Sequence, residues 1–599
     1  MRRAPFAIAL VAGLVLAGCG IPDDTDVVPL GPGPSTGTSS GDDVSPPRNM
    51  RADTTDPAEF AKNYLAAAAG DFAGAGERVK QFLSPDAAVN FKLANAAEIK
   101  VVRLTEEPLV NPGKPVVLRT RDVGTLGPKG ILEPAADDRI SNYELAVRQI
   151  DGQEGLFVTN PPKVLLLSDS ALNRFYSNRT IYFWNKEHTG LVPDVRYLPV
   201  TMPREQQPTE IIDWLTSGPS PWLTDVAEPL PGDTKQIGNV PAVSNQTLQI
   251  SLSGQALDPE DPNSLDRLQK QLRWSLWPNL PGTLHLTIEH QVEQDYTGTD
   301  YLGSNAAYRT TDDPERFVVF NGEIRRLVRS SNAGLPVPII KPEDNRGVRM
   351  AAMSTSGNRA YAALVVNESR GRQALKVGAA GVGEKAALRR IPLSGTVGRP
   401  VWAKSLDGAD GSTLGLITVG GKLYSFGADG SDFSTVEWPA GPGKITAVAV
   451  APDARRVALL AGGQLYVAAL SGGDGAQLSS PHVVRTELRS LTAVDWSSEG
   501  VLVVAGLRSD DRVAIMEVSI DGADQSDRLP DLGSNPVTYL TAAPANPTRG
   551  EETSGAIAYV LGTGAYDEVN PDQIGVADLA QPVNDPPKDM VPSAPFFLN

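Results

Sequence analysis

The chain has 599 residues, of which 41% are hydrophobic, and a formal net charge of −17 at pH 7. This length and apolar content predict several packed domains rather than one. Because phosphate backbones and anionic headgroups repel an acidic protein, the composition argues against nucleic-acid binding and against adhesion to a membrane through a basic surface.

The chain begins with the pattern of a secretion signal. Arg2 and Arg3 precede an apolar run over residues 6–16, which is much shorter than the roughly 20 residues that a membrane-spanning helix needs. The two arginines would also suit twin-arginine export, although a pair of positive charges is common in any signal peptide. We therefore predict a signal peptide over residues 1–18.

Cys19 is the single cysteine of the chain and directly follows this apolar run. The sequence Leu16-Ala17-Gly18-Cys19 resembles the bacterial lipobox, which implies cleavage between Gly18 and Cys19 and acylation of the Cys19 thiol and amino terminus. Two or more acyl chains hold a protein stably on a bilayer. The resemblance thus implies a lipid anchor at the extracytoplasmic face of the cell membrane; the alternative is a cysteine buried in a core.

A cleaved chain would have no second cysteine, so no intrachain disulfide can form and stability must come from large cores. Residues 19–55 are rich in Pro, Gly, Ser, Thr and Asp and lack apolar periodicity. Such a segment predicts a flexible, lipidated tether with a root-mean-square reach of roughly 30 Å.

Residues 56–178 have the pattern of a small α+β domain. Asp56-Pro57 starts a helical pattern, and a second one around Val79 ends at Ser84-Pro85. Short β-rich runs follow, among them residues 116–118 and 164–167. We expect helices on a curved sheet, and we find no catalytic motif there.

Residues 179–295 predict a second α+β domain with the order β-α-β-α-β. Residues 181–184 have the composition of a strand and residues 208–215 the pattern of a short helix. Alternating apolar residues predict strands at 248–252 and 284–288. Between them, we expect a longer helix with Asp261 as its N-cap.

Residues 340–599 contain a repeat of short strands. Residues 445–454 align with residues 491–500, 46 positions later, and a Gly-Gly turn recurs at 420 and 462. A period in the forties predicts a β-propeller, here of five to six blades. Residues 296–339 form a connector in which residues 317–322 resemble the outer half of a blade, and pairing with the C-terminal strands would close the ring.

The composition offers little material for a catalytic or metal centre. The four histidines are scattered at positions 188, 285, 290 and 482, and no thiol is available after acylation. We therefore predict no catalytic residues, no metal and no cofactor. His285 with Glu289 on one strand is the nearest to a site, but a simple solvated face is the better explanation of the pair. The acidic cluster of residues 258–261 could bind calcium, but it leads directly into a helix, and helix capping explains it better.

Three carboxylates occupy equivalent repeat positions: Asp407, Asp453 and Glu499. Propeller symmetry would place them on one face, where they could bind a cation or a sugar or supply a general acid and base. Acids also suit tight turns between strands, and Ser356 and Ala545 break the series. The turn interpretation is the plainer one.

The order of lipobox, tether, two α+β domains and cysteine-free propeller resembles the LpqB lipoprotein family of actinobacteria. The middle domain resembles that family's GerMN domain at residues 181–184, 215–219, 230–234, 248–253 and 280–282. The resemblance implies a non-enzymatic accessory protein that contacts the extracytoplasmic sensor domain of the histidine kinase of the MtrA/MtrB two-component system. It further implies an influence on cell-wall homeostasis and division.

Two other functions remain open from the sequence. A propeller hydrolase acting on cell-wall glycans or peptides would need acids that converge in the central channel. A passive scaffold would instead bind peptidoglycan, for example through the GerMN-like domain.

Overall fold

The computed structural model describes residues 50–310, 313–406, 413–438, 443–472, 475–549, 554–568 and 572–598. Every structural statement below refers to these residues. Cys19, Gly18 and the tether up to residue 49 lie outside them, as does Asp407. None of the described helices is long and apolar enough to cross a membrane.

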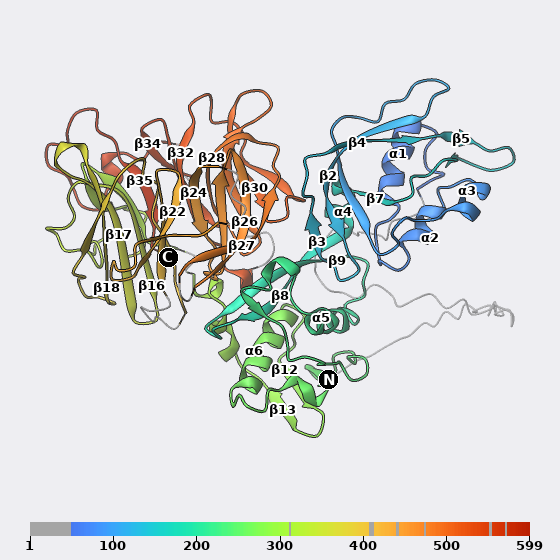
Figure 1. Cartoon of the computed structure of the whole chain (residues 1–599), viewed down its shortest axis with the longest axis horizontal. Coiled ribbons are helices and arrows are strands. Elements are labelled where there is room, and N and C mark those ends of the chain that lie inside the picture. Colours follow the sequence, from blue (N-terminus) through green and yellow to red (C-terminus); the bar gives the residue numbers. More distant parts are fainter. Residues whose placement is uncertain are drawn as a thin grey trace, which may run out of the picture. The chain divides into compact units, whose positions relative to one another are not determined.

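The N-terminal domain is a twisted sheet covered by short helices (Figure 1). Strands follow the order β3-β2-β1-β7, with β4 also on β2 and with β1 parallel to β7. Its elements are α1 (Pro57–Ala66), α2 (Ala75–Lys80), α3 (Pro85–Asn90), β1 (Ile99–Leu104), β2 (Val116–Leu126), β3 (Leu132–Pro134), β4 (Ile140–Leu145), β5 (Val147–Gln149), β6 (Leu156–Val158), β7 (Leu165–Ser168) and α4 (Asp169–Phe175).

Capping residues set the helix boundaries of this domain. Helix α1 begins as predicted, because the Asp56 carboxylate accepts the Ala58 N–H at 3.0 Å and Pro57 occupies the first turn. The expectation that Ser84 ends the second helix is wrong. Helix α2 already ends at Lys80, and the Ser84 hydroxyl instead caps α3 by accepting the Ala87 N–H at 3.2 Å.

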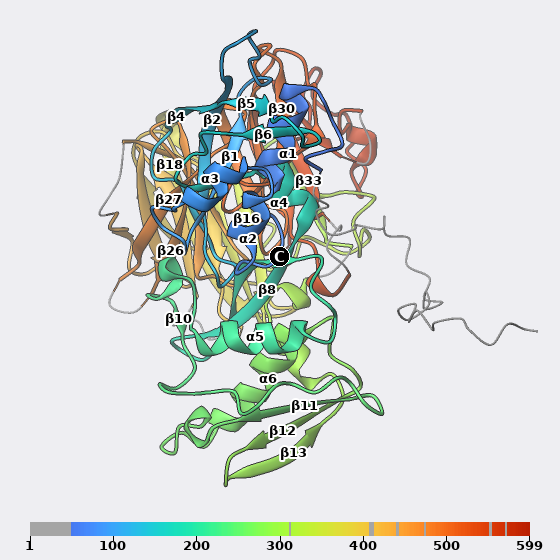
Figure 2. The ribbon, with the colours of Figure 1, turned by 90° about the vertical axis from the view of Figure 1, so that its right-hand side faces the viewer.

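The middle domain contains two three-stranded sheets, β10-β8-β9 and β11-β12-β13. Parallel β11 and β12 are joined through α6, which lies over their sheet and buries Leu268 and Leu272 against it (Figure 2). The elements are β8 (Tyr176–Asn185), β9 (Leu191–Pro199), α5 (Gln207–Thr216), β10 (Ala227–Glu228), β11 (Thr247–Leu252), α6 (Ser264–Leu276), β12 (Thr283–Ile288) and β13 (Val292–Tyr296).

The predicted β-α-β-α-β order lacks three strands that the structure contains, β9, β10 and β13. Strand β9 carries a buried ion pair in which Arg196 Nη2 lies 2.8 Å from Asp194 Oδ2. Asp194 also accepts the backbone N–H and the hydroxyl of Ser220, and Arg196 donates to the Gly218 carbonyl oxygen at 2.7 Å. The pair therefore fixes the Gly-Pro-containing loop after α5.

The N-cap prediction for α6 is also wrong. The helix begins at Ser264 after Asn263. Asp261 lies one turn earlier, where its carboxylate accepts the Asn263 N–H at 2.9 Å and pairs with Arg267. These contacts lower the pKa of Asp261, first through the Asn263 N–H and then through the Arg267 guanidinium.

The C-terminal part is a propeller of six sheets. These are β15-β14-β35, β16 to β19, β20 to β23, β24 to β27, β28 to β31 and β32 to β34. Their bounds are β14 (Arg316–Phe320), β15 (Glu323–Arg326), β16 (Val348–Ser356), β17 (Arg359–Asn367), β18 (Gln373–Gly381), β19 (Arg389–Leu393), β20 (Val401–Ala403), β21 (Leu414–Val419), β22 (Lys422–Gly427), β23 (Ser434–Thr435), β24 (Ile445–Val450), β25 (Arg456–Ala461), β26 (Gln464–Ser471), β27 (Gln477–Val484), β28 (Arg489–Trp496), β29 (Val501–Leu507), β30 (Val513–Ser519), β31 (Gln525–Leu529), β32 (Val537–Ala543), β33 (Ala556–Leu561), β34 (Gly564–Asp567) and β35 (Ser593–Phe597).

The ring closes between the first and last strands of the propeller. Strand β14 pairs antiparallel with β35, and the Phe317 and Phe596 rings stack with centroids 5.3 Å apart. The innermost strands contact one another in the order β35, β16, β20, β24, β28, β32 and back to β35. The multidomain fold with a propeller of five to six blades is thus confirmed, with six sheets. The closing strands expected in the connector belong to the first of them.

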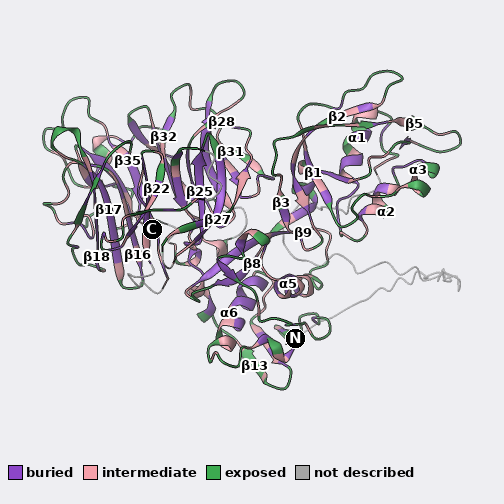
Figure 3. Cartoon of the chain, viewed as in Figure 1, coloured by how far each residue is buried: buried purple, intermediate pink, exposed green. Residues whose placement is uncertain are grey.

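Cores are shared across the domain boundaries. Buried residues follow the strands, whereas the turns are exposed (Figure 3). Ala523 of the propeller belongs to the N-terminal core and Ala469 to the middle core. Conversely, Val195 and Trp222 of the middle domain pack against a propeller core. The described residues between 50 and 598 belong to one compact unit.

Ring closure gives a stability prediction. Phe596→Ala should lower the free energy of unfolding by about 3 to 5 kcal/mol, because it leaves a cavity at the closing contact. Phe433→Ala is the matched control: Phe433 stacks on Tyr424 at the outer edge of one sheet and is half-buried, so its loss should cost about 1 kcal/mol. Chemical denaturation followed by tryptophan fluorescence measures both, and equal losses would contradict the closing role.

Candidate functional site at the junction of the middle domain and the propeller

Asp453 lies in the turn between β24 and β25. Its Oδ1 accepts the backbone N–H groups of Arg455 and Arg456 at 2.7 and 3.0 Å, and its Oδ2 pairs with Arg456 Nε at 2.6 Å. Both side chains are almost fully buried, and the Arg456 guanidinium lies over the Trp496 ring. These contacts make Asp453 a structural residue of its turn.

Glu499 lies in the corresponding turn between β28 and β29 but reaches out of the propeller. The Tyr182 hydroxyl on β8 donates to Glu499 Oε2 at 2.8 Å, and the Asn305 amide donates to Oε1 at 2.8 Å. Burial raises the pKa of the Glu499 carboxyl, and the two donors only partly offset this effect. Two repeat-equivalent acids therefore have different partners.

Further contacts join the two domains around Glu499. Arg455 Nη2 lies 3.0 Å from Glu187 in the β8–β9 hairpin, and the Tyr197 hydroxyl donates to Asp521 at 2.8 Å. The Trp222 and His482 rings meet edge to face, 5.1 Å apart. Sequence patterns did not indicate these partners, because each is a common residue type in a loop or strand without local periodicity.

The described acids do not form a catalytic pair. Asp453 is bound to Arg456, and Glu499 is covered by Tyr182 and Asn305. Asp407 lies outside the described residues. No group of three or more His, Cys, Asp or Glu side chains suited to a metal ion occurs in the described parts of the chain.

The structure also shows the partners of His285 and of the acidic cluster at residues 258–261. His285 does not pair with Glu289: its Nδ1 lies 2.6 Å from Asp295 and its Nε2 lies 3.7 Å from Glu293, both on the neighbouring strand β13. The cluster at 258–261 forms the turn before α6, where Asp258 accepts the Glu260 N–H at 2.9 Å.

An open groove of about 920 Å³ lies on the middle domain, where α6 begins. We name it the acidic groove. Its apolar walls include Trp184, Leu230, Leu257 and Leu268, and its acids are Glu228, Asp258, Asp261 and Asp266. Three basic side chains of the groove each pair with one of its acids. Lys270 lies 2.6 Å from Asp266, Arg267 pairs with Asp261, and His188 pairs with Glu228. Asp258 is exposed and has no cationic partner among the described residues, so the groove has an acidic character.

The buried Glu499 predicts a pH effect on stability. Because the native pKa is raised, the unfolded chain loses this proton first, and the wild type loses stability as the pH rises from about 4.3 through the raised value. Glu499→Gln does not titrate and still accepts the Tyr182 hydroxyl. We therefore expect the melting temperature of this variant, relative to the wild type, to increase with pH over that window.

The control for this experiment is Glu154→Gln, because Glu154 is exposed in the N-terminal domain. Its melting temperature should follow that of the wild type at every pH. A constant difference between Glu499→Gln and the wild type would contradict the raised pKa.

Two family models match the chain. Residues 180–291 match a family described as "Sporulation and spore germination", and residues 325–551 match the "Lipoprotein LpqB beta-propeller domain". The first match covers the two sheets of the middle domain up to β12, and the second covers most of the propeller.

Lipoproteins named LpqB are similar to the chain over most of its length. Lipoprotein LpqB of Thermobifida fusca is 23% identical over 82% of both chains. Those of Mycobacterium tuberculosis and Mycolicibacterium smegmatis are 22% and 24% identical over 91% and 90% of this chain and 93% and 92% of theirs. Among solved structures, TolB from Acinetobacter baumannii is 12% identical over 56% of this chain and 86% of its own, with a TM-score of 0.31. The two domain matches and these relatives thus make the chain a homologue of LpqB lipoproteins over about nine-tenths of its length.

Proposed function

We propose that the protein is anchored by a lipid on Cys19 to the extracytoplasmic face of the cell membrane and is a non-enzymatic accessory regulator of a sensor histidine kinase of the MtrB type. Through this kinase it would influence cell-wall homeostasis and division. The relationship to LpqB lipoproteins over about nine-tenths of the chain carries the proposal. The role of the kinase comes from the family resemblance.

The acidic groove is the surface we assign to the kinase. It combines apolar walls with a carboxylate, Asp258, that no described cation neutralises. A sensor-domain segment with basic and apolar side chains would complement both features. The groove lies on the same domain as Tyr182 and Glu187, so its position is fixed relative to the propeller by the junction.

The hydrolase alternative lacks comparable support. General acid and base catalysis needs two groups that are free to exchange protons with a substrate. The side chains of Asp453 and Glu499 are both buried and hydrogen-bonded to the protein. A scaffold that binds peptidoglycan differs from the kinase proposal only in its ligand, and the binding experiment separates the two.

Anchoring by Cys19 is tested at the amino terminus. Mass spectrometry of the N-terminal peptide from membrane-extracted protein should show a chain that begins with an acylated Cys19. Cys19→Ala should release the protein from the membrane fraction or leave it uncleaved, because without acyl chains only weak contacts with lipid remain. An unmodified Cys19, or a mature terminus at another residue, would overturn this part of the proposal.

Kinase binding is tested by calorimetry between the mature protein in detergent and the purified sensor domain. The paired change Glu228→Lys and Asp258→Lys should weaken binding by about tenfold, because it repels a basic partner. Affinity should also fall with rising salt as the Debye length drops below about 8 Å.

The matched control reverses the charge of two exposed acids that are far from the groove in sequence, through Asp151→Lys and Glu154→Lys. It changes the net charge equally and should bind as the wild type does. Equal loss in both variants would indicate a nonspecific charge effect. Absence of binding, with retention of peptidoglycan by the protein, would favour the scaffold.

A further inference from the structure

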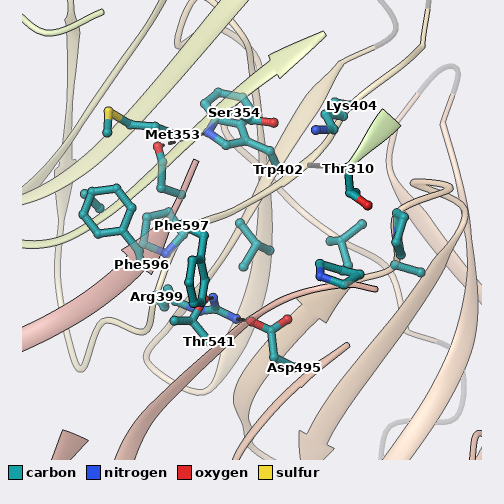
Figure 4. A pocket seen from close by; sticks show the side chains of 18 of the residues that line it. Thr310, Met353, Ser354, Arg399, Trp402, Lys404, Asp495, Thr541, Phe596 and Phe597 are labelled. Carbon is teal, nitrogen blue, oxygen red and sulfur yellow. Dashed lines mark hydrogen bonds and ion pairs between the residues drawn. The ribbon is translucent and has the colours of Figure 1, made fainter. Parts of the chain in front are cut away.

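The centre of the propeller encloses a small space of about 80 Å³ (Figure 4). Its wall comes from the innermost strands β16, β20, β24, β28, β32 and β35 and from Ala306 and Thr310 of the connector. Lys404 and Thr310 lie on one side, the pair of Arg399 and Asp495 on another, and Phe596 and Phe597 on a third. This space is separate from the acidic groove.

The charges of Arg399 and Asp495 are satisfied within the protein. Arg399 Nη2 lies 2.8 Å from Asp495 Oδ2, and its Nη1 donates to the Thr541 hydroxyl at 2.9 Å. Asp495 Oδ2 also accepts the Ala542 N–H at 2.9 Å. This pair therefore contributes no net charge to the channel.

Lys404 differs from this pair. Among the described residues, no carboxylate or carbonyl oxygen lies within hydrogen-bond or ion-pair distance of its ammonium group, although the side chain lines the channel. Burial and the nearby Arg309 guanidinium lower its pKa to about 8. The ammonium still holds its proton at neutral pH, and a cation in such surroundings favours a bound anion.

The residue after Lys404 points to the same conclusion. Ser405 is 3% exposed, and its hydroxyl has no hydrogen-bond partner in the part of the chain that the structure describes. It lines a small adjoining cavity that Lys404 also lines. A buried hydroxyl without a partner is unfavourable unless water or a ligand fills the space beside it.

The opposite wall of the channel is apolar. Met353, Phe596 and Phe597 are each less than 5% exposed and line the space, as does Trp402. The Trp402 indole N–H is already bound to the Ala352 carbonyl oxygen at 3.2 Å, so the ring offers only its carbon surface. The channel thus places the Lys404 ammonium, which pairs with none of the described residues, opposite a hydrophobic wall.

We propose that the propeller channel binds a small organic carboxylate, with its carboxylate group on Lys404 and a short apolar tail against Trp402, Met353 and Phe597. A single ammonium group suits a monovalent carboxylate. Inorganic phosphate would need several more donors, and the guanidinium that could supply them is engaged by Asp495. This site goes beyond the proposed kinase contact and does not depend on it.

The test is calorimetric titration of the mature protein with sodium butyrate, sodium acetate and inorganic phosphate, each against sodium chloride. Butyrate should bind roughly tenfold more tightly than acetate, because its two additional methylene groups are buried. Lys404→Met should weaken butyrate binding by about tenfold or more, since it removes a charge-assisted hydrogen bond. Lys404→Arg should retain much of the affinity.

Lys422→Met is the control, because Lys422 is an exposed lysine of β22 in the same propeller, and it should bind as the wild type does. Wild-type affinity should also fall as the pH rises through about 8, where Lys404 loses its charge. The charged groups around Lys404 are Arg309, Arg399 and Asp495, with Asp453 and Arg455 at the adjoining cavity.

The outcomes are distinguishable from one another. Absence of butyrate binding, or equal binding by the wild type and Lys404→Met, overturns the proposal. Tighter binding of phosphate than of butyrate overturns the carboxylate assignment. If Lys404→Met does not fold, the pH dependence of the wild type and the Lys404→Arg variant still decide, because a site without Lys404 would show no loss of affinity near pH 8.

Discussion

The rest of the propeller depends on the pairing of β14 with β35. These strands come from opposite ends of the propeller sequence, and without their pairing β16 and β32 would face no neighbouring sheet. Closure fixes the inner strands at defined positions around one axis. It therefore brings Arg399 and Asp495 together across the channel and holds the turns of Asp453 and Glu499 at the junction with the middle domain.

Asp453 and Glu499 occupy equivalent positions of the repeat but bind different partners. The Asp453 carboxylate is short and binds the N–H groups of its own turn. The Glu499 side chain is one methylene longer, and it reaches Tyr182 and Asn305 beyond the propeller. The symmetry of the propeller fixes the backbone position of each acid. The partner of the side chain depends on its length and on the residues of the neighbouring domain within its reach. For this reason the repeat alignment located both acids correctly in turns and could not assign their partners.

Local periodicity explains which parts of the fold were predictable from the sequence. Helix α1, strands β11 and β12 and the repeated strands of the propeller each have a capping residue, an alternating pattern or a period of their own. Strand β9 was missed because its pattern is interrupted by Asp194 and Arg196, which are buried only because they bind each other and the loop at 218–220. The contacts of Glu187 and Tyr197, and the surroundings of Lys404 in the channel, depend on segments that meet only in the folded chain.

The connector physically links the junction to the channel. Asn305 binds Glu499, whereas the next residue, Ala306, and also Thr310 line the channel. Between them, Arg309 donates to the Leu406 carbonyl oxygen at 2.9 Å and contributes to the lowered pKa of Lys404. An anion on Lys404 would offset the repulsion between these two cations. The same short segment, residues 305–310, therefore contacts both the buried carboxyl of the junction and the channel beside Lys404.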